Sequence, residues 1–228
     1  MTEAIISLDH VSRVYDMGHV EVPALDDVSL RVDKGEFVAI VGPSGSGKTT
    51  MMNIIGCLDR PTSGEYRLAG TPVADLDDDG LANLRSRTIG FVFQSYNLLP
   101  RTSALDNGAT PLLYQGVSRG DRTARATAAL ERLGLADRIH HEPTELSGGQ
   151  QQRVAVARAL VTEPALILAD EPTGNLDSHS GADVMEVLRE LNAAGSTIVL
   201  ITHDLGVASS ATRQIHLRDG RVLDRVLA

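Results

Sequence analysis

"GEFVAIVGPSGSGKTTMMNIIG", residues 35–56, joins a strand pattern to a helix pattern through a glycine-rich loop. The first seven residues form a short apolar run rich in β-branched side chains, which is typical of a buried strand. After the loop, apolar residues recur at helical spacing, at Met51, Ile54, Ile55 and Leu58. The stretch therefore predicts a strand, a loop and a helix of an α/β fold.

The loop itself matches the phosphate-binding pattern G-x-x-x-x-G-K-[ST]. Glycines let backbone N–H groups curl around a phosphate at the positive end of the helix. Lys48 would then reach the β- and γ-phosphates, and the Thr49 hydroxyl would bind Mg²⁺. The alternative is a glycine turn that only caps a helix, which the flanking strand and helix disfavour. We predict that the nucleotide-binding residues here are Gly42, Pro43, Ser44, Gly45, Ser46, Gly47, Lys48, Thr49 and Thr50.

A second apolar strand pattern, "ALILADE" at residues 165–171, ends in two acidic side chains. Asp170 is suited to water-mediated Mg²⁺ coordination, and Glu171 to polarising the water that attacks the γ-phosphate. An acidic pair at a strand end is as often a helix cap. Lys48 in the same chain favours the catalytic interpretation.

Composition limits the remaining possibilities. Of the 228 residues, 42% are hydrophobic and 22% charged, and no apolar run approaches the ~20 residues of a membrane-spanning helix. The N-terminus does not resemble a secretory signal, so we expect a cytosolic chain. Cys57 is the single cysteine, which excludes an internal disulfide framework, and its apolar neighbours predict a buried helix position. The net charge of -9 argues against broad binding to nucleic acid or anionic lipid, so any membrane contact should come through a partner.

The rest of the chain predicts an α/β core with an inserted helical lobe. Between Tyr96 and Val161, residues 118–135 and 148–161 have amphipathic helical patterns. A closing hairpin is expected around Asp219 and Gly220. Further strands are predicted at residues 4–8, 24–32, 88–93, 165–170 and 196–202.

Residues 146–160, "LSGGQQQRVAVARAL", resemble the signature of ATP-binding cassette ATPases, and the resemblance covers essentially the whole chain. Physically, the stretch offers a hydroxyl, N–H groups and a positive helix end to a phosphate, although it could also be a helix with a flexible cap. Its signature residues are Ser147, Gly148, Gly149 and Gln150. The resemblance implies a phosphate-loop ATPase core at residues 1–94 and 162–228, with an antiparallel β subdomain, and a helical subdomain at residues 95–161.

The same resemblance implies cofactors and partners. The cofactors would be ATP and Mg²⁺. Two chains would stack head to tail in the ATP-bound state, so that the phosphate loop of one and the signature of the other enclose each ATP. A separate transmembrane permease subunit would hold the homodimer on the cytoplasmic face of the membrane, and no nucleic acid is expected as a partner.

Four single residues gain a function only through the resemblance. Gln94, after a predicted strand, resembles the glutamine that contacts Mg²⁺ or the attacking water. His203 matches the histidine that contacts the γ-phosphate, and Asp177 resembles an aspartate that acts across the dimer. Tyr15 lies where the family places an aromatic ring that stacks on adenine. By themselves, a histidine here would more often be structural and an aspartate would be a turn, and the alternative for Tyr15 is a core tyrosine.

An apparent calcium loop at residues 75–80, "DLDDDG", is rejected. Asp75, Asp77, Asp79 and Gly80 have the right offsets, but the twelfth position is Ser86 instead of a bidentate glutamate. We expect these acids to cap the helix at residues 80–87.

Within the family, "NIIGCLDRPTSGEYRLAG" and "DEPTGNLDS" resemble the macrolide-export and lipoprotein-release branch. The chain departs from that branch at Asp106 and Gly108, in a segment expected to contact the membrane partner. The implied mechanism is an ATP-driven clamp in which Glu171 and His203 support hydrolysis. Three alternatives stay open: a soluble cassette ATPase outside transport, a small-molecule kinase, and a regulatory partner of a membrane complex that activates cell-wall enzymes.

Overall fold

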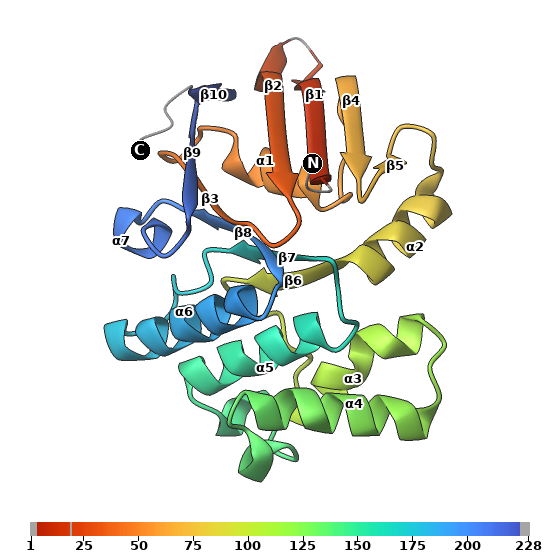
Figure 1. The fold of residues 1–228 in the computed structure, drawn as a ribbon, viewed down its shortest axis with the longest axis vertical. Helices are drawn as coiled ribbons and strands as arrows, with labels where there is room; N and C mark the ends of the chain where they lie inside the picture. Colours follow the sequence, from red (N-terminus) through yellow and green to blue (C-terminus); the bar gives the residue numbers. More distant parts are fainter. Residues whose placement is uncertain (1–3, 19, 224–228) are drawn as a thin grey trace. The chain divides into compact units, whose positions relative to one another are not determined.

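A computed structural model describes residues 4–18 and 20–223, and the chain divides into two compact units (Figure 1). The first unit comprises residues 1–85 and 195–228, and the second comprises residues 86–194. Because the chain leaves the first unit after Arg85 and returns at Gly195, the second unit is an insertion in the sequence of the first. Helix α2 (Asp78–Thr88) crosses the first boundary.

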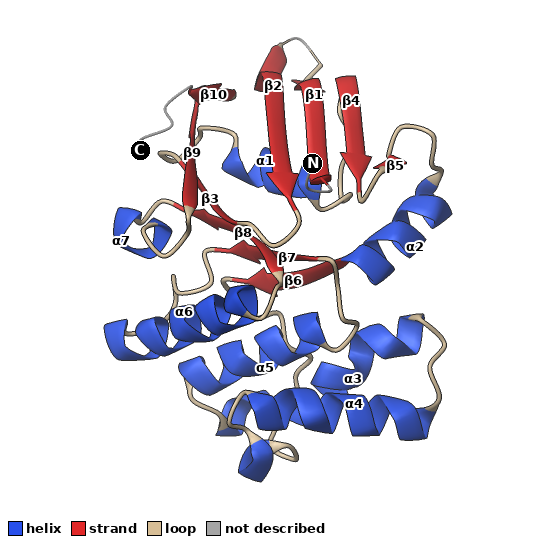
Figure 2. Cartoon of the chain, viewed as in Figure 1, coloured by secondary structure: helices blue, strands red, loops and turns tan. Residues whose placement is uncertain are grey.

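The first unit contains an antiparallel sheet with the strand order β2, β1, β4, β5 (Figure 2). Along β2, Val28, Leu30 and Val32 are buried and alternate with exposed residues, as in a strand with one covered face. The strands are β1 (Ala4–Asp16), β2 (Glu21–Asp33), β4 (Ser63–Leu68) and β5 (Thr71–Pro72).

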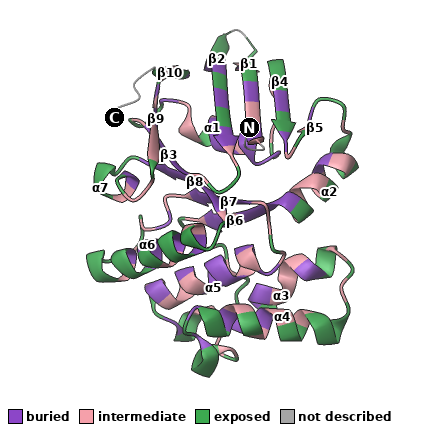
Figure 3. Ribbon diagram, in the orientation of Figure 1, coloured by how far each residue is buried: buried purple, intermediate pink, exposed green. Residues whose placement is uncertain are grey.

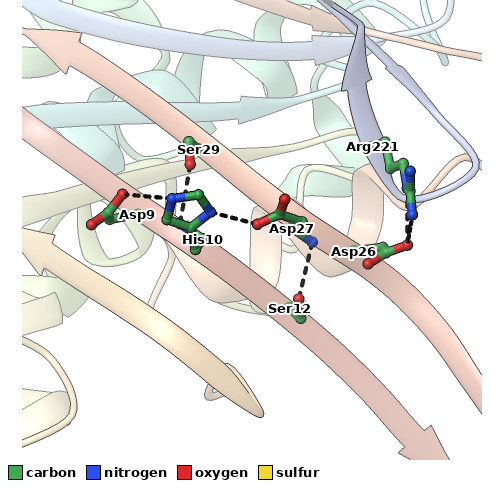
Figure 4. Close-up of polar contacts among 7 residues, drawn as sticks. All are labelled: Asp9, His10, Ser12, Asp26, Asp27, Ser29 and Arg221. Atoms are coloured by element: carbon green, nitrogen blue, oxygen red, sulfur yellow. Dashed lines mark hydrogen bonds and ion pairs between the residues drawn. The ribbon is translucent and has the colours of Figure 1, made fainter.

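Two residues with left-handed backbone, His10 (φ 51°) and Asp27 (φ 55°), lie where the β1–β2 ladder is irregular. Side chains bridge the two strands there (Figure 4). The Nδ1 atom of His10 lies 2.6 Å from Asp27 Oδ1, and the Asp27 N–H donates to Ser12 Oγ over 2.9 Å. The hydrogen bond with Asp27, followed by its charge, raises the pKa of His10. Side-chain hydrogen bonds thus stabilise this exposed site, where the regular backbone pairing of β1 and β2 is interrupted.

A second group of strands in the first unit has the order β10, β9, β3, β8, in which β9, β3 and β8 run parallel. Every residue of β3 is buried, as expected for a strand covered on both faces (Figure 3). The carboxyl ends of β3 and β8 lead into the loops that begin with Gly42 and His203. The elements are β3 (Phe37–Val41), β8 (Thr197–Thr202), β9 (Arg213–Arg218), β10 (Arg221–Leu223), α1 (Lys48–Ile55) and α7 (Leu205–Ala208).

The second unit pairs two parallel strands and contains most of the helices. Its helical core includes Leu112, Ala126 and Val161, which are all buried. The elements are β6 (Ile89–Phe93), β7 (Leu166–Asp170), α3 (Ala104–Tyr114), α4 (Arg119–Arg132), α5 (Gly148–Leu160), α6 (Ser178–Ala193) and the short 3-10 turns Ala136–Arg138 and Pro143–Glu145.

Asp106 and Gly108, the departures from the branch pattern, lie in the first turns of α3. The Ser103 hydroxyl accepts from the Asp106 N–H over 3.1 Å and donates to its carboxylate over 2.8 Å, which closes the helix N-terminus. A Cβ at Gly108 would lie 3.7 Å from that of Ala126, an ordinary contact distance, so packing does not demand glycine there. Both departures therefore have local structural settings.

The structure confirms the predicted strands and the closing hairpin, where Asp219 and Gly220 take left-handed conformations (φ 49° and 76°). Strands β4 and β5 and helices α3, α6 and α7 were not predicted from the sequence.

The predicted extent of α1 is wrong. The helix ends at Ile55, so Leu58 lies beyond it and is 48% exposed. Cys57 is buried as predicted, but in a turn with φ 52° instead of a helix. Burial, the largest effect, raises the pKa of its thiol to about 11.

Candidate functional site

The phosphate-loop motif lies between β3 and α1, as predicted. Gly45 (φ 78°) and Gly47 (φ 100°) are left-handed, a conformation that costs glycine little. A Cβ at Gly42 would collide with the Leu217 carbonyl oxygen, and one at Gly47 with that of Ala24. The loop can therefore follow this path only with glycine at positions 42 and 47, and glycine at position 45 avoids the strain of a left-handed side-chain residue.

The N-terminus of α1 is open. Gly47 is its N-cap residue, and no described side chain caps it. The Lys48 ammonium donates hydrogen bonds to the carbonyl oxygens of Gly42 (2.7 Å) and Pro43 (2.8 Å), so it folds back over the loop. A positive helix end and a lysine thus face the same small loop, an arrangement that suits a phosphate.

The β9–β10 turn is hydrogen-bonded to the phosphate loop, a contact that no sequence pattern indicates. The Gly220 N–H donates to the Ser46 carbonyl over 3.0 Å, and the Gly220 carbonyl accepts from the Asp26 N–H over 2.9 Å. Arg221 Nη2 and the Asp26 carboxylate are 2.6 Å apart (Figure 4). The loop's shape therefore depends on β2 and on the last hairpin, which lie far from it in sequence.

His203 lies at the same edge as the phosphate loop. In the β3–β8 ladder, Val41 pairs with Thr202, so Gly42 and His203 follow directly after paired residues of parallel strands. The structure thus brings the predicted histidine and loop together in the first unit. Tyr15, near the end of β1, belongs to this unit as well.

Gln94 and Glu171 are placed in the second unit by the same geometry. Phe93 pairs with Asp170 in the β6–β7 ladder, and Gln94 and Glu171 are the next residues. Glu171 has φ 42°, an uncommon left-handed value for a residue with a side chain. Such backbone strain is frequent at functional sites.

Asn175 holds Gln94 through two hydrogen bonds. The Gln94 amide donates to Asn175 Oδ1 over 3.3 Å, and the Asn175 amide donates to the Gln94 carbonyl over 3.0 Å. A Cβ at Gly174 would lie only 2.6 Å from Gln94 Nε2. The loop after β7 is thus shaped around the Gln94 side chain, and no sequence pattern indicates this packing.

The signature residues begin α5, as predicted. Ser147 Oγ accepts from the Gln150 N–H over 3.3 Å, and Gln150 Oε1 accepts from the Ser147 N–H over 2.9 Å, which forms a capping box. The glycines allow close packing: a Cβ at Gly148 would lie 3.0 Å from the Tyr96 hydroxyl, and one at Gly149 would lie 3.1 Å from Ser180.

Arg158, further along α5, holds the backbone that follows Gln94. Its guanidinium donates to the carbonyl oxygens of Tyr96 (2.8 Å) and Asn97, two left-handed residues. Burial lowers the pKa of Arg158. The helix that begins with the signature therefore also fixes the segment after Gln94.

Asp177 is the N-cap of α6. Its carboxylate accepts from the N–H groups of His179 (3.1 Å) and Ser180 (3.0 Å) and from the Ser180 hydroxyl (2.8 Å). These bonds, those from Ser180 first, lower the pKa of Asp177. Asp77 has a similar role at α2, where it accepts from the Gly80 N–H over 2.8 Å. The prediction that the acids at 75–80 cap a helix is confirmed for Asp77.

A family model described as ABC transporter matches residues 25–174. The chain belongs to the ABC transporter family. It is 56% identical over 223 residues to the macrolide export ATP-binding/permease protein MacB of Hyphomonas neptunium, covering 98% of this chain and 35% of that protein. It is 52% identical to an uncharacterized ABC transporter ATP-binding protein of Thermotoga maritima, covering 96% and 93%.

Among solved structures, the dimeric ABC transporter cassette MJ0796 matches with a TM-score of 0.87 and 48% identity, covering 96% of this chain and 97% of that one. The same cassette has been solved as a dimer in a post-hydrolysis state bound to ADP and Pi, with the same TM-score. These matches confirm the predicted family and the predicted ABC ATPase fold.

The chain spans about a third of the MacB relatives that it matches. The range matched by the family model, residues 25–174, includes the phosphate loop, Gln94, the signature, Asp170 and Glu171. Tyr15, Asp177 and His203 lie outside that range. No helix in residues 4–18 or 20–223 is long and apolar enough to cross a membrane.

Proposed function

We propose that this chain binds and hydrolyses ATP, and that two such chains power a separate membrane subunit of a transporter. The observation that carries the proposal is the start of α1, where an uncapped helix end and the Lys48 ammonium face one glycine loop. The positive helix end and the Lys48 ammonium both attract a polyphosphate, and the helix forms without a ligand at either group. The dimeric cassette bound to ADP and Pi, at 48% identity, supports the same conclusion.

The phosphate loop, residues 42–50, would cradle the phosphates with its N–H groups. Lys48 would exchange its bonds to the Gly42 and Pro43 carbonyls for phosphate oxygens, which are stronger acceptors because they are charged. Tyr15 would stack on adenine.

The predicted donor groups are chemically suited to a magnesium ion. Thr49 is exposed in the first turn of α1 and offers a hydroxyl, while Gln94 and Asp170 offer amide and carboxylate oxygens at strand ends. Oxygen ligands are those that Mg²⁺ prefers. When bound, the ion would neutralise charge on the phosphates.

Hydrolysis would use three side chains at strand ends. Glu171 would take the proton from the attacking water, Gln94 would orient that water, and His203 would contact the γ-phosphate. The left-handed backbone at Glu171 would set the direction of its carboxylate.

The second helix end would serve the neighbouring chain. In a head-to-tail dimer, Ser147, Gly148, Gly149 and Gln150 would contact the ATP held by the partner's phosphate loop, and Asp177 would act across the same interface. The dimeric form of the related cassette supports this arrangement.

The membrane partner follows from the relatives. The full name of MacB gives both ATP binding and a permease function to one protein. This chain matches 35% of that protein. The Thermotoga maritima relative is matched over 93% of its length and is named for ATP binding alone. These relatives support a permease on a separate chain. We propose further that this chain is peripheral on the cytoplasmic face, with an ATPase core at residues 1–94 and 162–228 and a helical subdomain at residues 95–161.

The proposal is tested by Mg-ATP turnover without an added acceptor. Glu171→Gln should bind ATP with unchanged affinity but hydrolyse it slower by roughly 100-fold or more, because a general base is lost. Glu190→Gln, an exposed glutamate on α6, is the matched control and should keep full turnover. Full turnover by Glu171→Gln would contradict the general-base assignment. Phosphoryl transfer only to an added acceptor would instead indicate a kinase.

The membrane partner is tested by a pull-down of tagged Glu171→Gln with Mg-ATP from detergent-solubilised membranes of the host. A stoichiometric integral membrane protein should co-purify. Recovery of soluble, ribosomal or nucleic-acid partners alone would overturn the transporter assignment and leave a soluble cassette ATPase.

A further inference from the structure

Two charged side chains of the first unit hold Tyr15. The guanidinium carbon of Arg13 lies 4.5 Å from the centroid of the Tyr15 ring, so a cation covers one ring face. The Tyr15 hydroxyl donates to Asp59 Oδ2 over 2.9 Å, and Arg13 Nε donates to the same oxygen over 2.9 Å. The three side chains thus form a closed triangle in which each contacts the other two.

Asp59 is in turn fixed to the helix that follows the phosphate loop. Its backbone N–H donates to the Asn53 carbonyl in α1 over 3.1 Å, and the N–H of Leu58 donates to the same carbonyl over 2.8 Å. The other carboxylate oxygen of Asp59 accepts from the Arg60 N–H over 2.7 Å. The position of the Tyr15 ring is therefore set relative to α1.

The triangle is partly withdrawn from water. The side chains of Arg13 and Asp59 are 25% and 24% exposed. Partial burial favours the neutral form of Asp59, but hydrogen bonds from Arg60, Tyr15 and Arg13 outweigh it and lower the pKa of this carboxyl. The carboxylate is thus charged at neutral pH and able to hold both partners.

We propose that Arg13 and Asp59 are positioning residues that hold Tyr15 as a one-faced stacking platform for the purine base of the nucleotide. The proposal rests on the nucleotide-binding function proposed above. Because Arg13 covers one face of the ring, a base can stack only on the other. Because Asp59 engages the hydroxyl, the ring offers the base its π-face without a hydrogen bond to the base edge.

The test compares the affinities of the full chain for Mg-ATP and for Mg-tripolyphosphate, which has the phosphates without the base. Tyr15→Ala should weaken ATP binding about tenfold and leave tripolyphosphate binding unchanged, because only base stacking is lost. Asp59→Ala should weaken ATP binding by about threefold or more, again without affecting tripolyphosphate. The double variant should match Tyr15→Ala alone, because Asp59 acts through the ring. In turnover, KM for ATP should rise while kcat stays unchanged.

The matched control is Asp78→Asn, which removes an acid 98% exposed and paired with Arg60 at 3.0 Å, and it should leave both affinities unchanged. If Asp59→Ala does not fold, as judged by its thermal transition, Asp59→Asn removes the charge with the side-chain shape kept and gives the same comparison. Equal losses for ATP and tripolyphosphate, additive losses in the double variant, or wild-type ATP affinity in Asp59→Ala would each overturn the proposal.

The wild-type chain separates this proposal from the function on which it rests. If it binds tripolyphosphate as tightly as ATP, the platform is overturned while the phosphate site stands. If it binds neither, the proposed nucleotide-binding function itself fails.

Discussion

Helices α1 and α5 both begin at glycine-rich residues, but their N-termini are completed differently. The N-cap of α1 is a left-handed glycine, Gly47, and no described side chain caps it. The N-cap of α5 is Ser147, which forms a reciprocal capping box with Gln150. One helix end leaves its N–H groups to a ligand, and the other satisfies part of them within the chain.

This difference predicts different roles for the two helix N-termini that could bind phosphate. No described side chain caps the α1 end, so this end suits the primary contact with the nucleotide. The α5 end already satisfies part of its N–H groups within the chain, so it suits a later contact made when a second chain approaches. The glycines differ as well, since Gly47 provides a backbone conformation whereas Gly148 and Gly149 allow close packing.

The strongest test of the comparison is Lys48→Ala. We expect roughly 100-fold weaker ATP binding, because charge-assisted hydrogen bonds to the phosphates are lost. Lys34→Ala, at the other lysine of the sequence, which is exposed, is the control and should bind normally. Titration calorimetry measures both. Equal affinities would remove α1 from its primary role.

Ser147→Ala tests the other helix end. Loss of the cap should lower the free energy of unfolding by ~1 kcal/mol, measured by urea denaturation. ATP affinity of the single chain should not change, whereas ATP-driven dimerisation in a Glu171→Gln background should weaken. Ser147→Thr keeps a hydroxyl and should behave as the wild type. A loss of single-chain affinity in Ser147→Ala would show that α5 takes part in the first contact.

Asp177 extends the comparison to a third helix end, that of α6, where a carboxylate caps the N-terminus. Its pKa is lowered in the folded chain, so its stabilising contribution is present above the unfolded pKa and is lost as the pH falls through the folded pKa. Asp177→Asn should therefore melt at a lower temperature than the wild type at pH 7, with the difference vanishing as the pH falls through the lowered pKa of Asp177. Asp183→Asn, at an exposed acid on the same helix, is the control and should melt at the wild-type temperature at pH 7.

Sequence patterns predicted those parts of the site whose residues lie close together in the sequence. The strand, loop and helix around Lys48 follow from β-branched residues, glycine spacing and helical periodicity within one stretch of sequence. The single residues Gln94, His203 and Tyr15 were found through resemblance to a family, because one side chain at a strand end has no periodicity.

The supporting contacts could not be predicted, because they join residues distant in sequence. Gly220 donates to Ser46 in the phosphate loop, and Arg158 reaches back to Tyr96. Neither pair has a spacing that a pattern could reveal. The end of α1 was misjudged for another reason: Leu58 continues the apolar period after the helix has stopped.

The buried Cys57 has a practical consequence for measuring motion. A thiol that is buried and has a pKa of about 11 is largely protonated at neutral pH, so it reacts slowly with maleimide dyes. Cysteines introduced at exposed Glu65 in the first unit and Glu131 in the second would then be the reactive thiols. A fluorescent donor and acceptor at these positions would report the distance between the units through the ATP cycle without removal of the native cysteine.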